Sequence, residues 1–221
     1  MFMKDTQMLQ SKAYDHLIGL IKDGKLKEGE YYSLNKMAKE SDVSRTPFRD
    51  AVLRLEQERY IDVFPSKGFT LHKMTKDDIV ETYQLRYALE TYCFKQLSIH
   101  LDSERGQQYY NKLSGKVQSQ HEIIETSHNN EDFARKDYEF HRSVVQFVGN
   151  ESMLEIYRRF MYRIFWQTAT SFLQEGRMED TVKEHQTILD YVKEHRLQEL
   201  EDLIGSHLHI AQEINLKIVN P

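Results

Sequence analysis

The sequence predicts a mainly α-helical protein in two parts: three helices with a small β-hairpin, then an all-helical antiparallel bundle of about six helices. The chain has 221 residues but only nine Gly and three Pro, the residues that most often interrupt helices and bound strands. Its charge is unevenly divided. Residues 1–74 hold 13 Lys and Arg against 11 Asp and Glu, whereas residues 75–221 hold 17 against 24. We expect two domains, 1–74 and 75–221, because this length exceeds what one core usually needs.

The overall composition excludes several classes of protein. The net charge of −5 argues against a protein that coats nucleic acid without specificity. The one cysteine, Cys93, allows no internal disulfide, which fits a reducing cytoplasm. No apolar run approaches the ~18 residues of a membrane span, and the start "MFMKDTQMLQSK" lacks the apolar core of a signal peptide. We expect a soluble, cytoplasmic protein with no membrane partner.

The first part of the chain predicts three short helices. Apolar residues at helical spacing favour a helix over 11–23, which ends before Gly24. Ser33 stands where it can cap a second helix, and Ser44 where it can cap a third. Pro47 lies in the first turn of the third helix, where its missing N–H has no intrahelical partner to lose.

Two short β-type runs follow the third helix. They are "YIDVF" from Tyr60 and "GFTLHKM" from Gly68, and the intervening "PSKG" supplies turn residues. Three helices followed by a hairpin predict a winged helix-turn-helix, in which the hairpin is the wing.

The third helix has an apolar side and an arginine side. The apolar side holds Phe48, Ala51, Val52 and Leu55. On the other side Arg45 and Arg49 lie one turn apart, next to Thr46, and suit DNA phosphates or guanine edges in a major groove. Ordinary solvated arginines are the alternative. We favour DNA contact because the helices and hairpin occur in the required order, and Lys67 at the hairpin tip adds a further cation.

The second part begins with a long helix. Thr75 and Asp78 have the spacing of a capping box at its first turn. Further helical patterns cover 103–126, 130–148, 151–174, 178–195 and 197–218, and no strand pattern separates them. Helices joined by short turns pack antiparallel, so we expect a bundle.

Histidines of the second part offer a candidate metal site. Asp137 and His141 are four residues apart, so they share one face of a helix and can bind a single metal. His185 is a third candidate, and either His207 or His209 a fourth. Three imidazoles and one carboxylate suit Zn or Ni, with Fe or Mn also compatible. A lone helical histidine is more often packing or surface, and composition alone does not select these four.

Arg86, in "LRYALE", is open to two interpretations. An ion pair with Glu90 is one, because opposite charges four residues apart are neighbours on a helix. A clamp for a ligand's carboxylate is the other, because guanidinium offers a two-pronged donor.

The stretch "SLNKMAKESDVSRTPFRDAVLRLEQERYIDVFPSKGF" resembles the N-terminal domain of the GntR family of bacterial transcription regulators. The resemblance implies that operator DNA is contacted by residues of the third helix and the wing, namely Ser44, Arg45, Thr46, Arg49, Lys67 and Gly68. One departure is Arg59, where the family commonly has glycine. Either the local turn differs or Arg59 adopts an unusual backbone angle.

The segment from Thr75 to Ile218 resembles the FCD domain of the FadR-type branch of that family, with "LRYALE", "DYEFHRSVVQFVGN", "EHQTIL" and "SHL" in the expected order. The resemblance implies an effector-binding and dimerisation domain of the metal-containing variant rather than the acyl-CoA-binding one. The implied metal ligands are Asp137, His141, His185 and His207. Arg86 would then bind an effector carboxylate.

Together these features predict a transcription repressor that binds a palindromic operator as a homodimer. A small organic acid, bound at the metal, would release or modulate it. A metal-sensing regulator is an alternative. A metal-dependent enzyme is less favoured, because no further carboxylate or histidine has a motif that marks it as a general base.

Overall fold

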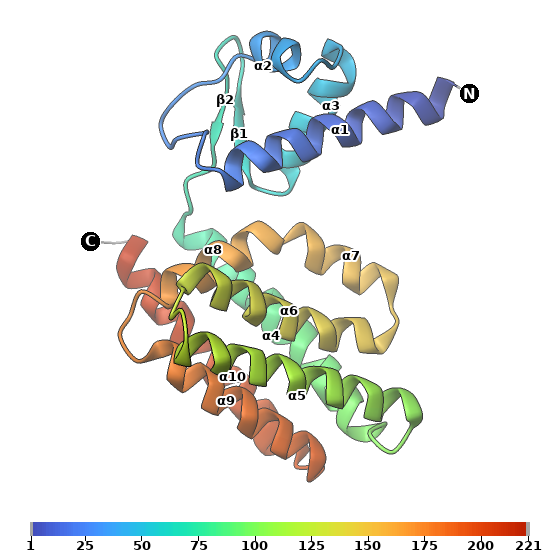
Figure 1. Ribbon diagram of the computed structural model, residues 1–221, viewed down its shortest axis with the longest axis vertical. Coiled ribbons are helices and arrows are strands. Elements are labelled where there is room, and N and C mark those ends of the chain that lie inside the picture. Colours follow the sequence, from blue (N-terminus) through green and yellow to red (C-terminus); the bar gives the residue numbers. More distant parts are fainter. Residues whose placement is uncertain (1, 220–221) are drawn as a thin grey trace. The chain divides into compact units, whose positions relative to one another are not determined.

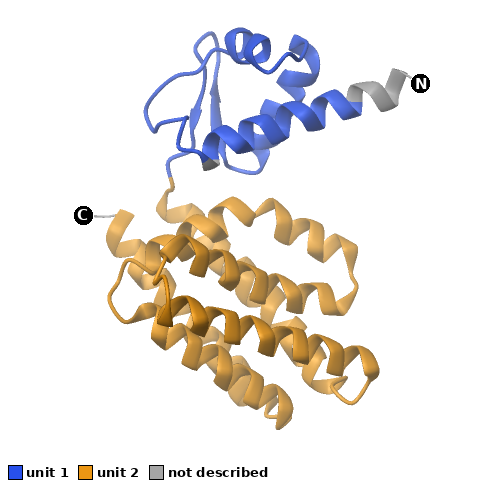
Figure 2. Ribbon diagram, viewed as in Figure 1, with its two compact units in different colours: residues 1–73 blue, residues 74–221 orange. Residues whose placement is uncertain are grey.

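The computed structural model describes residues 2–219, with the backbone alone at residues 2–6 and 22. The chain divides into two compact units between Lys73 and Met74 (Figure 2). The sequence placed this division one residue later.

The first unit contains three helices and one hairpin (Figure 1). Its elements are α1 (Phe2–Lys22), α2 (Leu34–Glu40), α3 (Arg45–Gln57), β1 (Ile61–Phe64) and β2 (Gly68–Leu71). The two strands pair antiparallel, from Ile61 opposite Leu71 to Phe64 opposite Gly68. Three helices and a hairpin wing confirm the predicted fold of this part.

Helix α1 begins earlier than its apolar pattern indicated, at Phe2 instead of at residue 11. Ala13 and Leu17 of this helix are fully buried, whereas Met8 is 68% exposed. The exposed Met8 therefore gives no buried apolar position that would reveal this part of the helix in the sequence.

The apolar side of α3 forms the centre of this unit. Its predicted core residues Phe48, Ala51, Val52 and Leu55 are all 0% exposed. They pack α3 against α1 and β1, which fixes the opposite side of the helix toward solvent.

The two predicted serine caps have the right position but not the expected hydrogen bond. Ser33 and Ser44 do occupy the N-cap positions of α2 and α3, but neither side chain makes a capping hydrogen bond. The hydroxyl of exposed Ser44 is therefore not engaged in holding the start of α3.

Arg59 has the unusual backbone angle that the sequence raised as a possibility. Its φ is 59°, in the left-handed region, and its side chain is exposed. A residue with a Cβ in this region carries a steric cost that glycine avoids.

We expect Arg59→Gly to stabilise the first unit by up to ~1 kcal/mol, since relief of the left-handed strain outweighs the added freedom of the unfolded chain. Urea unfolding measures the change. Gln57→Gly is the matched control, because this exposed residue lies in α3 and should lose ~0.5–1 kcal/mol. Equal destabilisation by both variants would contradict the assignment of strain to Arg59.

The second unit is a bundle of helices without described strands (Figure 1). The helices are α4 (Lys76–Ile99), α5 (Glu104–Glu125), α6 (Asn130–Val148), α7 (Glu151–Arg159), α8 (Met161–Ser171), α9 (Arg177–Lys193) and α10 (Leu197–Val219). The predicted segment 151–174 is two helices, because the chain breaks at Phe160. No Gly or Pro marks that break in the sequence.

Helix α4 is the central element of the bundle and packs against α6, α8, α9 and α10. Its start confirms the predicted capping box, in which the Thr75 hydroxyl accepts from the Asp78 N–H and the Asp78 carboxylate accepts from the Thr75 N–H. Every described helix of the chain falls short of the combined length and apolar character that a membrane crossing requires.

Candidate metal centre and DNA-contact surface

The first turns of α3 present a polar and cationic surface. Ser44, Arg45, Thr46 and Arg49 are all exposed, whereas Pro47 and Phe48 between them are buried. Arg49 has a loose ion pair with Asp50, with 3.8 Å between Nη2 and Oδ1. Within the described residues, Arg45 has no acidic partner at ion-pair distance. The predicted DNA-contacting residues of α3 therefore share one accessible side of the helix.

The wing holds the other two predicted DNA contacts in different settings. Lys67 is exposed at the turn between the strands, and its Nζ lies 5.4 Å from the centroid of the Tyr31 ring. Gly68 is buried, with φ 104°, and a Cβ there would lie 2.1 Å from the carbonyl oxygen of Tyr32. Gly68 is thus required by the fold, because any side chain would collide with this backbone.

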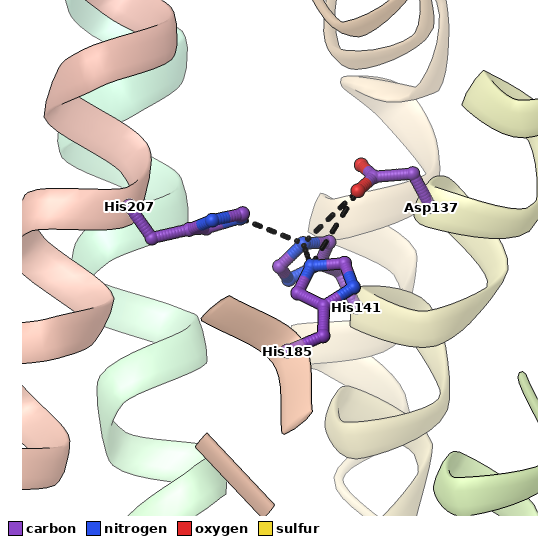
Figure 3. Close-up of side chains that lie close together, drawn as sticks. All are labelled: Asp137, His141, His185 and His207. Carbon is purple, nitrogen blue, oxygen red and sulfur yellow. Dashed lines mark hydrogen bonds and ion pairs between the residues drawn. The ribbon is translucent and has the colours of Figure 1, made fainter. Parts of the chain in front are cut away.

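Asp137, His141, His185 and His207 lie together inside the helical bundle (Figure 3). The first two come from α6, the third from α9 and the fourth from α10. All four side chains are buried, and one ligand atom from each lies within 4.8 Å of the others. The structure thus brings together the four residues that the sequence proposed.

The distances within the cluster suit coordination of one ion. Nε2 of His141 lies 3.2 Å from Nε2 of His185 and 3.3 Å from Nε2 of His207. Oδ1 of Asp137 lies 3.7 Å from His141 Nε2 and 3.5 Å from His185 Nε2. Ligands ~2.0–2.2 Å from a common metal have comparable separations.

Each imidazole has a side-chain oxygen close to its outer nitrogen, Nδ1. Gln120 Oε1 is hydrogen-bonded to His185 Nδ1 at 2.9 Å, and Glu184 Oε2 to His207 Nδ1 at 2.6 Å. Glu90 Oε2 lies 2.7 Å from His141 Nδ1 as an ion-pair contact that is not aligned as a hydrogen bond. Such oxygens only accept, so Nδ1 of His185 and of His207 carries the hydrogen and their Nε2 atoms keep their lone pairs. The Nε2 atoms of three imidazoles and one carboxylate oxygen therefore converge on one point. This donor set fits a divalent transition metal, which satisfies all four at once.

The pKa values of His185 and His207 favour the neutral, metal-binding form. Burial lowers the pKa of His185 well below its usual value, and neighbouring His207 and His141 add to the effect. Burial also lowers the pKa of His207, although its hydrogen bond to Glu184 opposes this. Burial acts to raise the pKa of Glu184, but hydrogen bonds from His207 and Arg177 outweigh it and lower that pKa to about 2. Neutral imidazoles are the form that a metal binds.

Arg86 makes the ion pair that was one of its two interpretations. Its Nε donates to Glu90 Oε1 at 2.7 Å, and both side chains are buried. Tyr157 also donates to Glu90 Oε1, at 2.9 Å. Burial acts to raise the pKa of Glu90, but the charges of Arg86 and His141 outweigh it and lower that pKa well below its usual range. Nη2 of Arg86 is buried without a hydrogen-bond partner among the described residues.

The sequence did not predict which residues contact the outer nitrogens of the three histidines, and it singled out Glu90 only as a possible partner of Arg86. Glu90, Gln120, Arg177 and Glu184 come from three helices, α4, α5 and α9. Glu184 directly precedes His185, yet it contacts His207, because successive helical residues point in different directions. His209, the other candidate on α10, is exposed and close to Gln212 rather than to the cluster.

Comparison with known proteins places both units in described families. Residues 9–71 match the family described as bacterial regulatory proteins, gntR family, and residues 81–210 match the FCD domain. The FCD match alone covers more than half of the chain.

Two relatives and one solved structure cover most of the chain. The uncharacterised HTH-type transcriptional regulator YdhC of Bacillus subtilis is 24% identical, over 89% of this chain and 86% of that protein. A gluconate operon transcriptional repressor of Bacillus licheniformis is 25% identical, over 84% of this chain and 74% of that protein. A GntR regulator structure from Rhodococcus sp. RHA1 has the same fold, with a TM-score of 0.71 at 16% identity, over 94% of this chain and 97% of that one. Family and relatives indicate a regulator of transcription rather than an enzyme. The chain therefore belongs to the GntR family of bacterial transcription regulators and combines its helix-turn-helix domain with an FCD domain.

Proposed function

We propose that this protein is a cytoplasmic repressor that binds a palindromic operator as a homodimer, and that a small organic acid bound at the metal centre releases it. The converging donor set of Asp137, His141, His185 and His207 is the observation that carries the proposal, because it gives the helical unit a built site for a signal. One winged helix buries little surface on DNA, so two copies on a two-fold symmetric site supply the affinity.

The DNA contacts in this proposal are Ser44, Arg45, Thr46, Arg49 and the wing residues Lys67 and Gly68. The exposed arginines of α3 suit bases and phosphates in a major groove. Lys67, at the tip of the hairpin, suits a phosphate or the neighbouring groove. At Gly68 the contact would be made by the backbone.

The metal in this proposal is Zn or Ni, with Fe or Mn compatible with the same ligands. Three imidazoles and one carboxylate leave further positions on a metal that takes more than four ligands. A carboxylate of the effector suits such a position, and it would also accept from Arg86 Nη2, the buried donor without a described partner. All four metal ligands are at most 5% exposed, which favours a small effector. One relative is named as a repressor of a gluconate operon, and gluconate is a small carboxylate.

Release of DNA would follow from a shift between two populations. An effector favours whichever arrangement of the protein binds it more tightly, and it changes DNA affinity only by that difference. A metal-sensing regulator would instead be released by a change in the metal itself.

Operator binding under controlled metal and acid concentrations tests this proposal. We expect DNA selected from a random pool by the dimer to contain an inverted repeat. We also expect at least one acid from a panel of small carboxylates, gluconate included, to weaken binding by at least tenfold while the metal stays bound. Release that follows the metal concentration alone would favour the metal-sensing alternative. Chemical conversion of an acid by the purified protein would contradict a purely regulatory role.

A further inference from the structure

The three imidazoles of the metal centre are held by acceptors of different charge. His185 faces an amide, Gln120, whereas His141 and His207 face carboxylates, Glu90 and Glu184. An anionic acceptor at Nδ1 fixes the tautomer more strongly than a neutral one and makes Nε2 a better donor to a metal. His207 therefore has this support through a hydrogen bond, and His141 has it through the charge of Glu90, whose Oε2 lies 2.7 Å away without hydrogen-bond alignment.

Each of the two carboxylates is matched by a buried arginine from its own helix. On α4, Arg86 Nε donates to Glu90 Oε1 at 2.7 Å. On α9, Arg177 donates from Nη1 and Nη2 to the two oxygens of Glu184, both at 2.8 Å. Arg177 Nη2 also lies 3.4 Å from the backbone oxygen of His207. Arg86 is 4% exposed and Arg177 is 3% exposed, so both guanidinium groups are buried.

The same arrangement, Arg–Glu–His, is thus built twice from unrelated parts of the sequence. The arginine and glutamate are four residues apart on α4 and seven apart on α9, and both spacings place them on one side of a helix. The first set acts on a histidine of α6 and the second on a histidine of α10. Each pair is neutral overall, so the support for the imidazoles adds no net charge beside the metal ligands.

We propose that Glu90 and Glu184 are positioning residues of the metal centre, each holding its histidine with Nε2 toward the metal, and that Arg86 and Arg177 hold these carboxylates in place. The proposal rests on the metal site proposed above. It gives Arg86 a role that is independent of any effector, and it assigns roles to Arg177 and Glu184, which the sequence did not suggest. Without its arginine, a buried carboxylate would be an unpaired charge, which is costly in the interior.

Glu184 is the better residue for a test, because its side chain is 17% exposed whereas that of Glu90 is 0% exposed. We expect Glu184→Ala to weaken Co²⁺ binding ~10–100-fold, as loss of outer-shell support typically does. Glu184→Gln keeps an oxygen acceptor at the same place, so it should retain part of the affinity. Competition with a chelating dye measures both, and the visible spectrum of bound Co²⁺ reports whether the ligand geometry changes.

The control is Glu201→Ala, which removes an ion pair with Lys95 between α10 and α4 that does not contact the four ligands. We expect this variant to bind Co²⁺ as the unaltered protein does. A general loss of stability would weaken both alanine variants, whereas a positioning role affects only Glu184.

A metal-free measurement separates this role from the metal site itself. Nitrogen-15 NMR of His207 should show the Nδ1–H tautomer in the unaltered protein and in Glu184→Gln, and a mixture in Glu184→Ala. Unchanged Co²⁺ affinity and tautomer in Glu184→Ala would overturn the positioning role while leaving the metal site in place. Failure of the unaltered protein to bind Co²⁺ would overturn both.

Discussion

Replacing His185 by Ala should lower the affinity for Zn²⁺ by more than ~100-fold, beyond the range that loss of an outer-shell partner causes. His185 supplies an Nε2 atom 3.2 Å from that of His141 and 3.5 Å from Asp137 Oδ1, so its removal opens one side of the donor set. The bundle should still fold, because Phe140, which stacks on the imidazole at 4.1 Å between centroids, keeps its other contacts. Elemental analysis and competition with a chelator measure the change, and the response of operator binding to the effector should weaken with it.

His209→Ala is the matched control for this experiment. His209 lies two residues beyond His207 on α10, but it is exposed and outside the cluster. We expect this variant to keep its full metal content. Full metal occupancy in His185→Ala, or loss of metal in His209→Ala, would show that the ligand set has been assigned incorrectly.

Arg45→Ala and Arg49→Ala should each weaken the free energy of specific operator binding by ~1–3 kcal/mol, which is roughly 5–150-fold in affinity. Both side chains are exposed on the side of α3 opposite its buried residues Phe48 and Val52. Neither side chain supports the core, so the loss should arise in the DNA complex and the thermal stability of the free protein should change little. Fluorescence anisotropy with selected operator DNA measures the affinity.

Two further measurements separate base recognition from general attraction. If the arginine contacts a phosphate, its removal should reduce the slope of log affinity against log salt concentration by about one. If it contacts a base, its removal should relax the sequence preference at one position of the operator. Arg196→Ala is the control, because it removes the same charge from an exposed site in the helical unit. If the α3 variants bind operator as tightly as this control does, α3 is not the recognition helix.

The parts of the fold that the sequence predicted are those with strong local patterns. The helical spacing of Phe48, Ala51, Val52 and Leu55 indicated which side of α3 is buried. Thr75 with Asp78 indicated where α4 begins. The break at Phe160 has no such local signal, because it depends on how α7 and α8 pack within the bundle. The missing capping bonds of Ser33 and Ser44 likewise depend on side-chain orientation rather than on residue type.

The candidate site was predictable only in its innermost residues. Spacing linked Asp137 to His141, and the family resemblance selected His185 and His207 from the remaining histidines. Gln120 is a polar residue among others on α5, and only the packing of α5 against α9 brings it to His185. For Arg86, spacing offered the ion pair with Glu90 and the family resemblance favoured a ligand clamp; the structure shows the ion pair, with Nη2 unpartnered among the described residues.

The chain's single cysteine has a consequence for oxidation chemistry. Cys93 is 0% exposed on α4, and burial, with the charge of Glu90 adding to it, raises the pKa of the thiol to about 12. Thiolate is the reactive form, and oxidants must also reach the sulfur. While the helical unit is folded, the thiol of Cys93 is therefore both shielded from oxidants and held in its unreactive protonated form.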